Sequence, residues 1–279
     1  MIEGWQPREE SIHLRFGIEY HKALQNYRLL RTDGLDHDDA VLEVVHEMLY
    51  STSDWDPDIT TKAGYYKNRR SLFRSVIWYL DSHQDDVVAI HILENGKPAV
   101  ELSFRFELDY GPNGWDQPYV LAGHLDEIVN YNEDLFVEDH KTTTMKPGEN
   151  YFAQYEPNNQ MSFYALASRV IIHGNTPIKG VIVNAAYLTV DATQFFRGFT
   201  FRNDDQLNEW ASDLKSWLRK AERSAIENDW PRNDTACDKY GGCRFRDICS
   251  QGPAVRQTFL KAGFVKVPVE ERWNPLKTR

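Results

Sequence analysis

Residues 123–143 read GHLDEIVNYNEDLFVEDHKTT, and this stretch decides the fold. It lies within two segments that alternate or run apolar as strands do, residues 119–131 and residues 135–143. Only a short polar turn around Asn132 and Glu133 separates them. The sequence therefore predicts an antiparallel hairpin.

Two acidic residues of this hairpin face each other if the turn is centred between Asn132 and Glu133. Pairing counted outward from that turn places Asp126 directly opposite Asp139, with Cβ atoms about 4.5–5.5 Å apart. Like charges in this position are destabilising, and a divalent cation is the simplest way to offset the repulsion. Lys141 lies two residues after Asp139 and so shares its face of the sheet. The same counting pairs Lys141 with His124.

Two carboxylates and an amine on one face suit phosphodiester chemistry. Carboxylate oxygens favour magnesium or manganese over softer metals. Such a metal could polarise a phosphodiester, activate water and steady the leaving oxygen, while Lys141 could orient or help deprotonate that water, or neutralise charge on phosphorus. Taken alone, these residues leave open a plain surface hairpin with solvated charges.

Regular elements are predicted on both sides of the hairpin from the period of the apolar residues. Helices are expected at 13–31, 36–50, 67–80, about 158–173 and about 204–228, and further strands at 99–108, 178–190 and 194–201. Helices followed by strands, a helix, strands and a helix indicate a mixed α/β fold with one central sheet.

The composition is typical of a folded protein. The chain has 279 residues, of which 41% are hydrophobic and 13% aromatic, and this argues against disorder. The net charge of −10 argues against a general nucleic-acid binder, although binding depends on a local patch. No apolar run approaches the roughly 20 residues of a membrane helix. Residues 1–16 lack the pattern of a signal peptide, so a cytoplasmic location is expected.

The hairpin and three further motifs together resemble one enzyme family. GHLDEIV, a short turn and VEDHKTT are similar to the strand-turn-strand signature of the PD-(D/E)xK nucleases. Gly17–His21 resembles the GxxxH motif of their RecB-like branch, and Gln160–Tyr164 resembles its QxxxY motif. The cysteines near residue 243 resemble its C-terminal motif. This branch includes exonucleases associated with CRISPR adaptation and many phage nucleases.

The resemblance implies a restriction-endonuclease-like core with a helical insertion and a C-terminal cysteine segment. It also implies roles for single residues. Metal ligands would be His21, Asp126, Asp139, the backbone carbonyl of His140 and, through a water or a second metal, Glu101. Lys141 would be the catalytic lysine, and Gln160 and Tyr164 would order the site or touch DNA. Leu125 stands where the name-giving proline would be, and proline carries no chemistry.

Three cysteines lie close together in the sequence, at Cys237, Cys243 and Cys249. They resemble the late part of an iron–sulfur motif in which one early cysteine completes a 4Fe–4S cluster. This chain has no early cysteine, and four thiolates are the norm for such clusters. A ligand upstream of residue 1, a substituting histidine, zinc in place of iron, or three small buried apolar residues remain open.

Two groups of basic residues could contact DNA phosphates. The first is Lys67, Arg69, Arg70 and Arg74 on one expected helix, and the second is Arg244 and Arg246 beside the cysteines. The alternative for each group is a solvated face of the protein.

One domain over 1–279 is expected, with a helical part at 13–80, a catalytic core at 98–202, the C-terminal helix and cysteine segment at 203–250, and a tail at 251–279. The resemblance implies a metal-dependent deoxyribonuclease, foremost an exonuclease. A structure-specific endonuclease and a catalytically silent DNA-binding or assembly module are the alternatives. DNA is the expected partner, with further proteins of a recombination or CRISPR-adaptation complex and no membrane.

Overall fold

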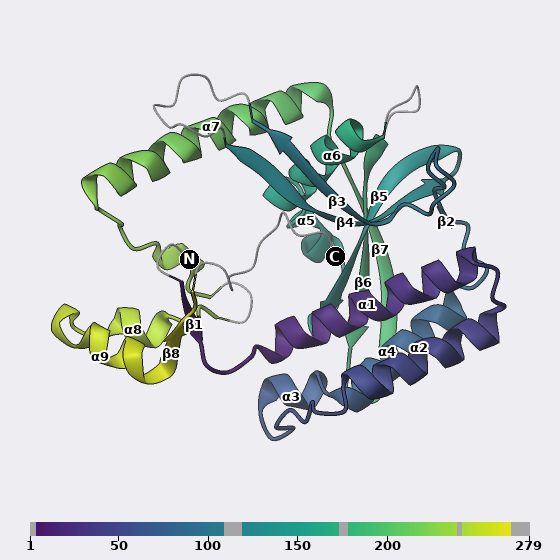
Figure 1. Ribbon diagram of the computed structural model, residues 1–279, viewed down its shortest axis with the longest axis horizontal. Coiled ribbons are helices and arrows are strands. Elements are labelled where there is room, and N and C mark those ends of the chain that lie inside the picture. Colours follow the sequence, from purple (N-terminus) through teal and green to yellow (C-terminus); the bar gives the residue numbers. More distant parts are fainter. Residues whose placement is uncertain (1–3, 109–118, 173–177, 239–241, 269–279) are drawn as a thin grey trace.

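A mixed six-stranded sheet forms the centre of the molecule, and helices cover both of its faces (Figure 1). The computed structural model describes residues 4–108, 119–172, 178–238 and 242–268. The strands of this sheet are β2 (Ala89–Ile90), β3 (Val100–Glu107), β4 (Val120–Tyr131), β5 (Asp134–Thr143), β6 (Ile178–Leu188) and β7 (Thr193–Phe201). The mixed α/β fold predicted from the sequence is confirmed.

The strands run in the order β2-β4-β5-β6-β7, and β3 also pairs with β4. The β4–β5 and β6–β7 pairs are antiparallel, whereas β5 and β6 are parallel. A parallel pair needs a crossover connection. The segment between β5 and β6 supplies it, with α5 (Glu149–Ala153) and α6 (Asn159–Ile171).

The hairpin turn has the geometry that joins twisted strands most directly. Asn132 and Glu133 have φ angles of 48° and 69°, as a two-residue type I′ turn requires. The register follows the sequence prediction from Tyr131 and Asp134 back to Glu127 and Glu138. The pairing of β4 with β5 ends there, one position before the two aspartates. The direct backbone pairs predicted for Asp126 with Asp139, and for His124 with Lys141, are therefore not formed.

The helices before the sheet pack against one of its faces. They are α1 (Ile12–Thr32), α2 (His37–Ser51), α3 (Lys62–Tyr66) and α4 (Arg69–Ser82). Apolar side chains of α1, α2 and α4 form one core cluster with Ala186 and Leu188 of β6. Val181, Val183 and Ala185 point to the opposite face and pack with α5 and α6. This alternation is the period of two that a strand imposes.

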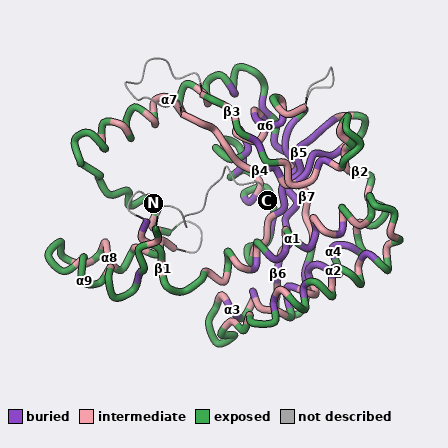
Figure 2. The backbone as a smooth tube through the Cα atoms, viewed as in Figure 1, coloured by how far each residue is buried: buried purple, intermediate pink, exposed green. Residues whose placement is uncertain are grey.

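The C-terminal part of the chain is less buried than the central sheet. Figure 2 shows burial concentrated on the central strands and on the inner sides of α1 and α4, whereas α7 (Asp204–Glu227) is largely exposed. None of the described helices is both long and apolar enough to cross a membrane.

Both described ends of the chain meet in a second, two-stranded sheet. β1 (Trp5–Pro7) pairs antiparallel with β8 (Phe264–Lys266). Beside it lie α8 (Arg246–Ser250) and α9 (Pro253–Gly263), and the rings of Phe245 and Phe264 stack at 4.6 Å. The segment predicted as a tail from residue 251 is therefore a helix and a strand up to Lys266. Its strand partner lies at the other end of the sequence, so local pattern could not predict it.

A buried ionic cluster joins α1 to the hairpin. Glu127 and Glu138 face each other across β4 and β5 and are almost fully buried. Arg28 of α1 places its Nε 3.3 Å from Glu127 and an Nη atom 3.7 Å from Glu138. His140 Nε2 lies 3.6 Å from Glu127. These four side chains form one buried network. Removing one member of such a network leaves uncompensated charge in the interior.

Replacing Arg28 with alanine is expected to lower the free energy of unfolding by about 3–5 kcal/mol, because Glu127 loses its guanidinium partner and Glu138 keeps only Arg197, at 4.0 Å. Arg31, one turn further along α1 and exposed, is the matched control. Its replacement is expected to cost less than about 1 kcal/mol. Urea denaturation of both variants measures the difference, and equal losses would refute a structural role for the cluster.

Candidate active site

One cavity of about 700 Å³ brings the predicted site residues together. His21, Asp126, Asp139 and Lys141 all line it, although they come from α1, β4 and β5. The cavity opens where the pairing of β4 and β5 has ended. The parting of the two strands thus provides room between the aspartates that a continuous ladder would have closed.

Asp126 replaces the missing backbone pairing with side-chain contacts. Its Oδ2 accepts a hydrogen bond of 3.1 Å from the backbone N–H of His140. The same oxygen lies 3.1 Å from Nδ1 of His21. The His21 ring also meets the His140 ring edge-on, with centroids 6.1 Å apart. These contacts link α1 to both strands of the hairpin.

Asp139 is held by the lysine two residues later on the same face. The Nζ of Lys141 donates to Oδ1 at 2.8 Å and lies 2.7 Å from Oδ2. Asp139 is 1% exposed. Its Oδ2 accepts no hydrogen bond of normal geometry despite the nearby amine. A buried carboxylate oxygen in this state retains a lone pair for another ligand.

The pKa values of the two aspartates shift in opposite directions. Burial would raise the pKa of Asp126, but His21 and then Lys141 outweigh it and hold that pKa well below its usual range. Burial raises the pKa of Asp139 above its usual value; Lys141 opposes this shift and the charge of Asp126 adds to it. The pKa of Lys141 is raised because both carboxylates outweigh its burial. The site thus holds a permanently charged amine beside at least one permanently charged acid.

The donor set fits a hard divalent cation. Two carboxylates are ligands that magnesium and manganese both accept, and the imidazole of His21, a ligand typical of transition metals, favours manganese over magnesium. The partly unsatisfied Oδ2 of Asp139 is the local observation that favours such a ligand. A cation between the aspartates would also offset the repulsion that raises the pKa of Asp139.

Gln160 and Tyr164 of α6 line the same cavity. The side-chain amide of Gln160 donates to the Tyr164 hydroxyl at 2.9 Å, as their spacing of one helical turn allows. Burial raises the pKa of Tyr164, and the charges of Asp139 and Asp126 raise it further. Tyr164 therefore lies within electrostatic range of both aspartates and stays protonated.

Glu101 has an unusual backbone. Its φ of 48° is left-handed, although it is the second residue of β3. The pairs Val100 with Glu127 and Leu102 with Leu125 enclose it, so it lies beside Asp126 across the strand pair. A non-glycine residue in this region costs about 1–3 kcal/mol, and such residues concentrate at functional sites.

A second acidic group lies behind the hairpin, on the opposite face. Glu127, Glu138 and His140 have ligand atoms within 4.8 Å of one another, and within the described part of the chain no other such trio of His, Cys, Asp or Glu is found. Arg28 already stands beside both glutamates. The protein thus supplies its own cation on this face, which disfavours a second one by like-charge repulsion.

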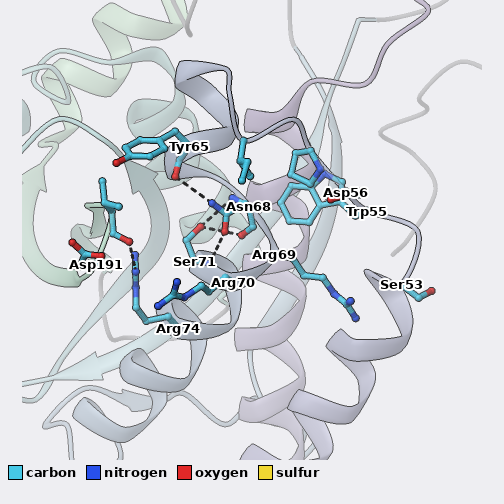
Figure 3. Close-up of a pocket in the computed structure, with 13 residues that line it drawn as sticks. Ser53, Trp55, Asp56, Tyr65, Asn68, Arg69, Arg70, Ser71, Arg74 and Asp191 are labelled. Atoms are coloured by element: carbon cyan, nitrogen blue, oxygen red, sulfur yellow. Dashed lines mark hydrogen bonds between the residues drawn. The ribbon is translucent and has the colours of Figure 1, made fainter.

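The first basic group predicted to contact DNA is mostly engaged inside the protein. Lys67 is 4% exposed and its Nζ donates to Thr142 Oγ1 at 2.9 Å. Arg69 donates to Thr52 and to the carbonyl of Leu49. Arg74 donates to the carbonyls of Thr189, Val190 and Ala192 and so closes the loop that contains Asp191 (Figure 3).

Arg70 is the exposed member of this group. It lies with Arg69 and Arg74 around a separate cavity of about 580 Å³ (Figure 3). None of the predicted metal ligands lines that cavity, and neither does Lys141. The geometry therefore gives Lys67, Arg69 and Arg74 structural contacts within the protein, and their expected contacts with phosphate stay a prediction. Sequence pattern could not distinguish the two, because the partners come from distant loops.

The cysteines lie beside the sheet formed by β1 and β8. The N–H of Cys243 donates to the carbonyl of Cys237 at 2.8 Å, and all three thiols are half-buried and free. Of the second basic group, Arg244 donates to the carbonyl of Glu9 at 2.6 Å and Arg246 to Asp238 at 2.6 Å. Hydrogen bonds and strand pairing thus connect the cysteine segment to the N-terminus.

Sequence reasoning missed the apolar wall of the cavity. Phe163 of α6 and Trp210 and Leu214 of α7 line it, as do Leu14 and Ile18 of α1. Helical spacing is visible for Trp210 and Leu214 in the sequence, but it does not show that they border a cavity. Within α7, the buried residue is Leu207.

Comparison with known proteins supports a single family. The sequence model of the PD-(D/E)XK nuclease superfamily matches residues 2–250. No curated protein matches the chain. The crystal structure of SSO0001 aligns at 14% identity over 86% of this chain and 94% of that chain, with a TM-score of 0.35. A candidate exonuclease from Eubacterium rectale aligns at 11% identity over 84% and 74%, with a TM-score of 0.42. These two structures are too distant to carry an argument, so the assignment depends on the family match.

Lys67 provides a pH-dependent test of its burial. Desolvation lowers the pKa of Lys67 to about 8, whereas an unfolded lysine titrates near 10.5. Between these values the unfolded state binds more protons, so stability rises with pH. From pH 7.5 to 9.5 the wild type is expected to gain about 1–2 kcal/mol relative to Lys67→Met. Urea denaturation at both values checks this, and a constant difference would contradict the burial of a charged lysine.

Proposed function

The chain belongs to the PD-(D/E)XK nuclease superfamily, and from this premise we propose that it hydrolyses phosphodiester bonds of DNA with a divalent cation at Asp126 and Asp139. One observation carries the proposal: His21, Asp126, Asp139 and Lys141 line a single cavity and contact one another in pairs. Three of these residues lie on the β4–β5 hairpin, and the docking of α1 brings His21 to them.

We propose Asp126, Asp139 and His21 as the metal ligands, with the backbone carbonyl of His140 completing the set. Glu101 is proposed to act through a water or a second cation, and its left-handed backbone beside Asp126 supports this role. When bound, magnesium or manganese supplies Lewis-acid polarisation of the phosphodiester and a lower pKa for the attacking water.

Lys141 acts next to this position. Its ammonium group is held 2.7–2.8 Å from Asp139 and stays protonated. A fixed positive charge at this place stabilises the negative charge that builds on the phosphoryl oxygens in the transition state. The hydrogen-bonded pair of Gln160 and Tyr164 positions the substrate from the α6 side of the cavity.

Within nuclease activity, we propose exonucleolytic cleavage, in DNA repair, recombination, phage or CRISPR-adaptation processes. The resemblance of the motifs to the RecB-like branch supports this choice. A structure-specific endonuclease on the same core is the alternative, and further proteins would be partners of either enzyme.

Cys237, Cys243 and Cys249 are proposed to hold a structural metal, either a 4Fe–4S cluster with a fourth ligand not among these three or a zinc ion. The support is their spacing and their place beside the paired chain ends. Visible absorbance and the iron and zinc content of anaerobically purified protein decide between them. A metal-free protein would contradict the proposal.

Replacing Asp139 with asparagine is expected to reduce DNA cleavage by at least about a hundredfold, because a metal-ligand charge is lost. Asp134→Asn is the matched control, since Asp134 begins the same strand but pairs with Lys179 at the surface. It is expected to leave activity unchanged. Full activity of Asp139→Asn would refute the proposed site, provided that both variants show the wild-type melting temperature.

Metal dependence and the mode of cleavage need a separate experiment. Labelled linear and covalently closed circular DNA are incubated with manganese, with magnesium and with EDTA. We expect cleavage of the linear DNA with either metal and none with EDTA. Cleavage of the circle would favour the endonuclease, and binding without cleavage under all conditions would favour a catalytically silent module.

A further inference from the structure

We propose that Phe163 and Trp210 form a stacking platform for one unpaired base, so that the cavity accepts single-stranded DNA ends in preference to a duplex. This inference deepens the proposed function and rests on it. Its basis is the aromatic and apolar part of the cavity lining, which none of the proposed catalytic roles uses.

The two rings are held rigidly. Phe163 and Trp210 stack with centroids 5.9 Å apart and planes 23° from parallel. Phe104 packs edge-on against Phe163 at 5.0 Å, and the indole N–H of Trp210 donates to Asn159 at 3.1 Å. Both rings stay partly exposed at the cavity. A rigid aromatic surface loses little entropy when a ligand stacks on it.

The part of the lining that α1 supplies is also apolar, and its side chains are exposed. Leu14 and Ile18 of α1 are 59% and 46% exposed and lie one turn apart. Between them, within the continuous helix α1, lies Gly17, where an added Cβ would meet nothing within 4 Å. Glycine inside a helix costs about 1 kcal/mol relative to alanine. Packing does not require this glycine, and its effect is to keep the cavity wide.

The lining of the cavity indicates which form of DNA it suits. Among the described residues of the lining, Lys141 is the one lysine or arginine, and Asp139 engages it, so phosphate contacts distinguish neither form of DNA. A duplex hides the faces of its bases, so it cannot stack a base on the rings of Phe163 and Trp210. An unpaired nucleotide exposes a base that can stack on aromatic rings. The volume of about 700 Å³ suits a ligand of nucleotide size.

The test measures binding without divalent metal, using the full chain. A labelled oligothymidylate, which forms no duplex, is compared with a blunt hairpin duplex of equal length by fluorescence anisotropy in EDTA. We expect tighter binding of the oligothymidylate. Trp210→Ala is expected to weaken that binding about tenfold and Trp210→Phe by less than threefold, because the smaller ring still stacks.

Trp217→Ala is the matched control, because Trp217 is on the same helix but is 65% exposed and outside the cavity. It is expected to bind as the wild type does. Gly17→Leu is a second variant that narrows the cavity from α1 without disturbing the rings, and it is expected to weaken binding as well. Unchanged binding by Trp210→Ala and Gly17→Leu, or equal affinity for the blunt duplex, overturns the proposal.

Failure of this inference can be told apart from failure of the proposed function. Hydrolysis of DNA with manganese tests the metal site alone. If the protein hydrolyses DNA while Trp210→Ala binds normally, the stacking platform is refuted and the nuclease stands. If binding depends on Trp210 but no DNA is hydrolysed, the platform stands and the nuclease proposal fails.

Discussion

The structure depends on how the β4–β5 hairpin accommodates two pairs of acidic residues, one pair on each face of the sheet. Because side chains alternate along a strand, Asp126 and Asp139 point to one face and Glu127 and Glu138 to the other. Like charges placed across a strand pair repel. On the glutamate face the protein supplies the cation itself, through Arg28 at 3.3 and 3.7 Å. On the aspartate face the strands part, and the resulting space suits a metal ion.

Helix α1 contacts acidic residues of both pairs. Arg28 and His21 lie two helical turns apart on it, and Arg28 contacts Glu127 while His21 contacts Asp126. Tight docking of α1 on the buried glutamates therefore also sets the position of the histidine at the cavity. Burial of a charged cluster is a poor source of net stability, and here its contacts join α1 to both strands of the hairpin. The fold thus ties the geometry of the site to its most deeply buried interaction.

The cavity combines this charged floor with aromatic and apolar walls from α1, α6 and α7. The chain carries a net charge of −10, and few cations line the cavity. Within this cavity, phosphate attraction by many cations is therefore not available. The proposed metal ion for the phosphate and the proposed rings for the base would together reconcile an acidic protein with a nucleic-acid substrate.

Local pattern determined the central elements, the register of the hairpin and the shared face of Asp139 and Lys141, because strand period and a two-residue turn are properties of neighbouring residues. The GxxxH motif predicted His21 as a ligand of the same site as Asp126, but the contact between the two side chains depends on the docking of α1. The parting of β4 and β5, the internal contacts of Lys67, Arg69 and Arg74, and the pairing of β1 with β8 were decided by the tertiary structure. Each of these features joins segments that are far apart in the chain. The periodicity of the sequence describes neighbouring residues and does not encode which distant segments meet.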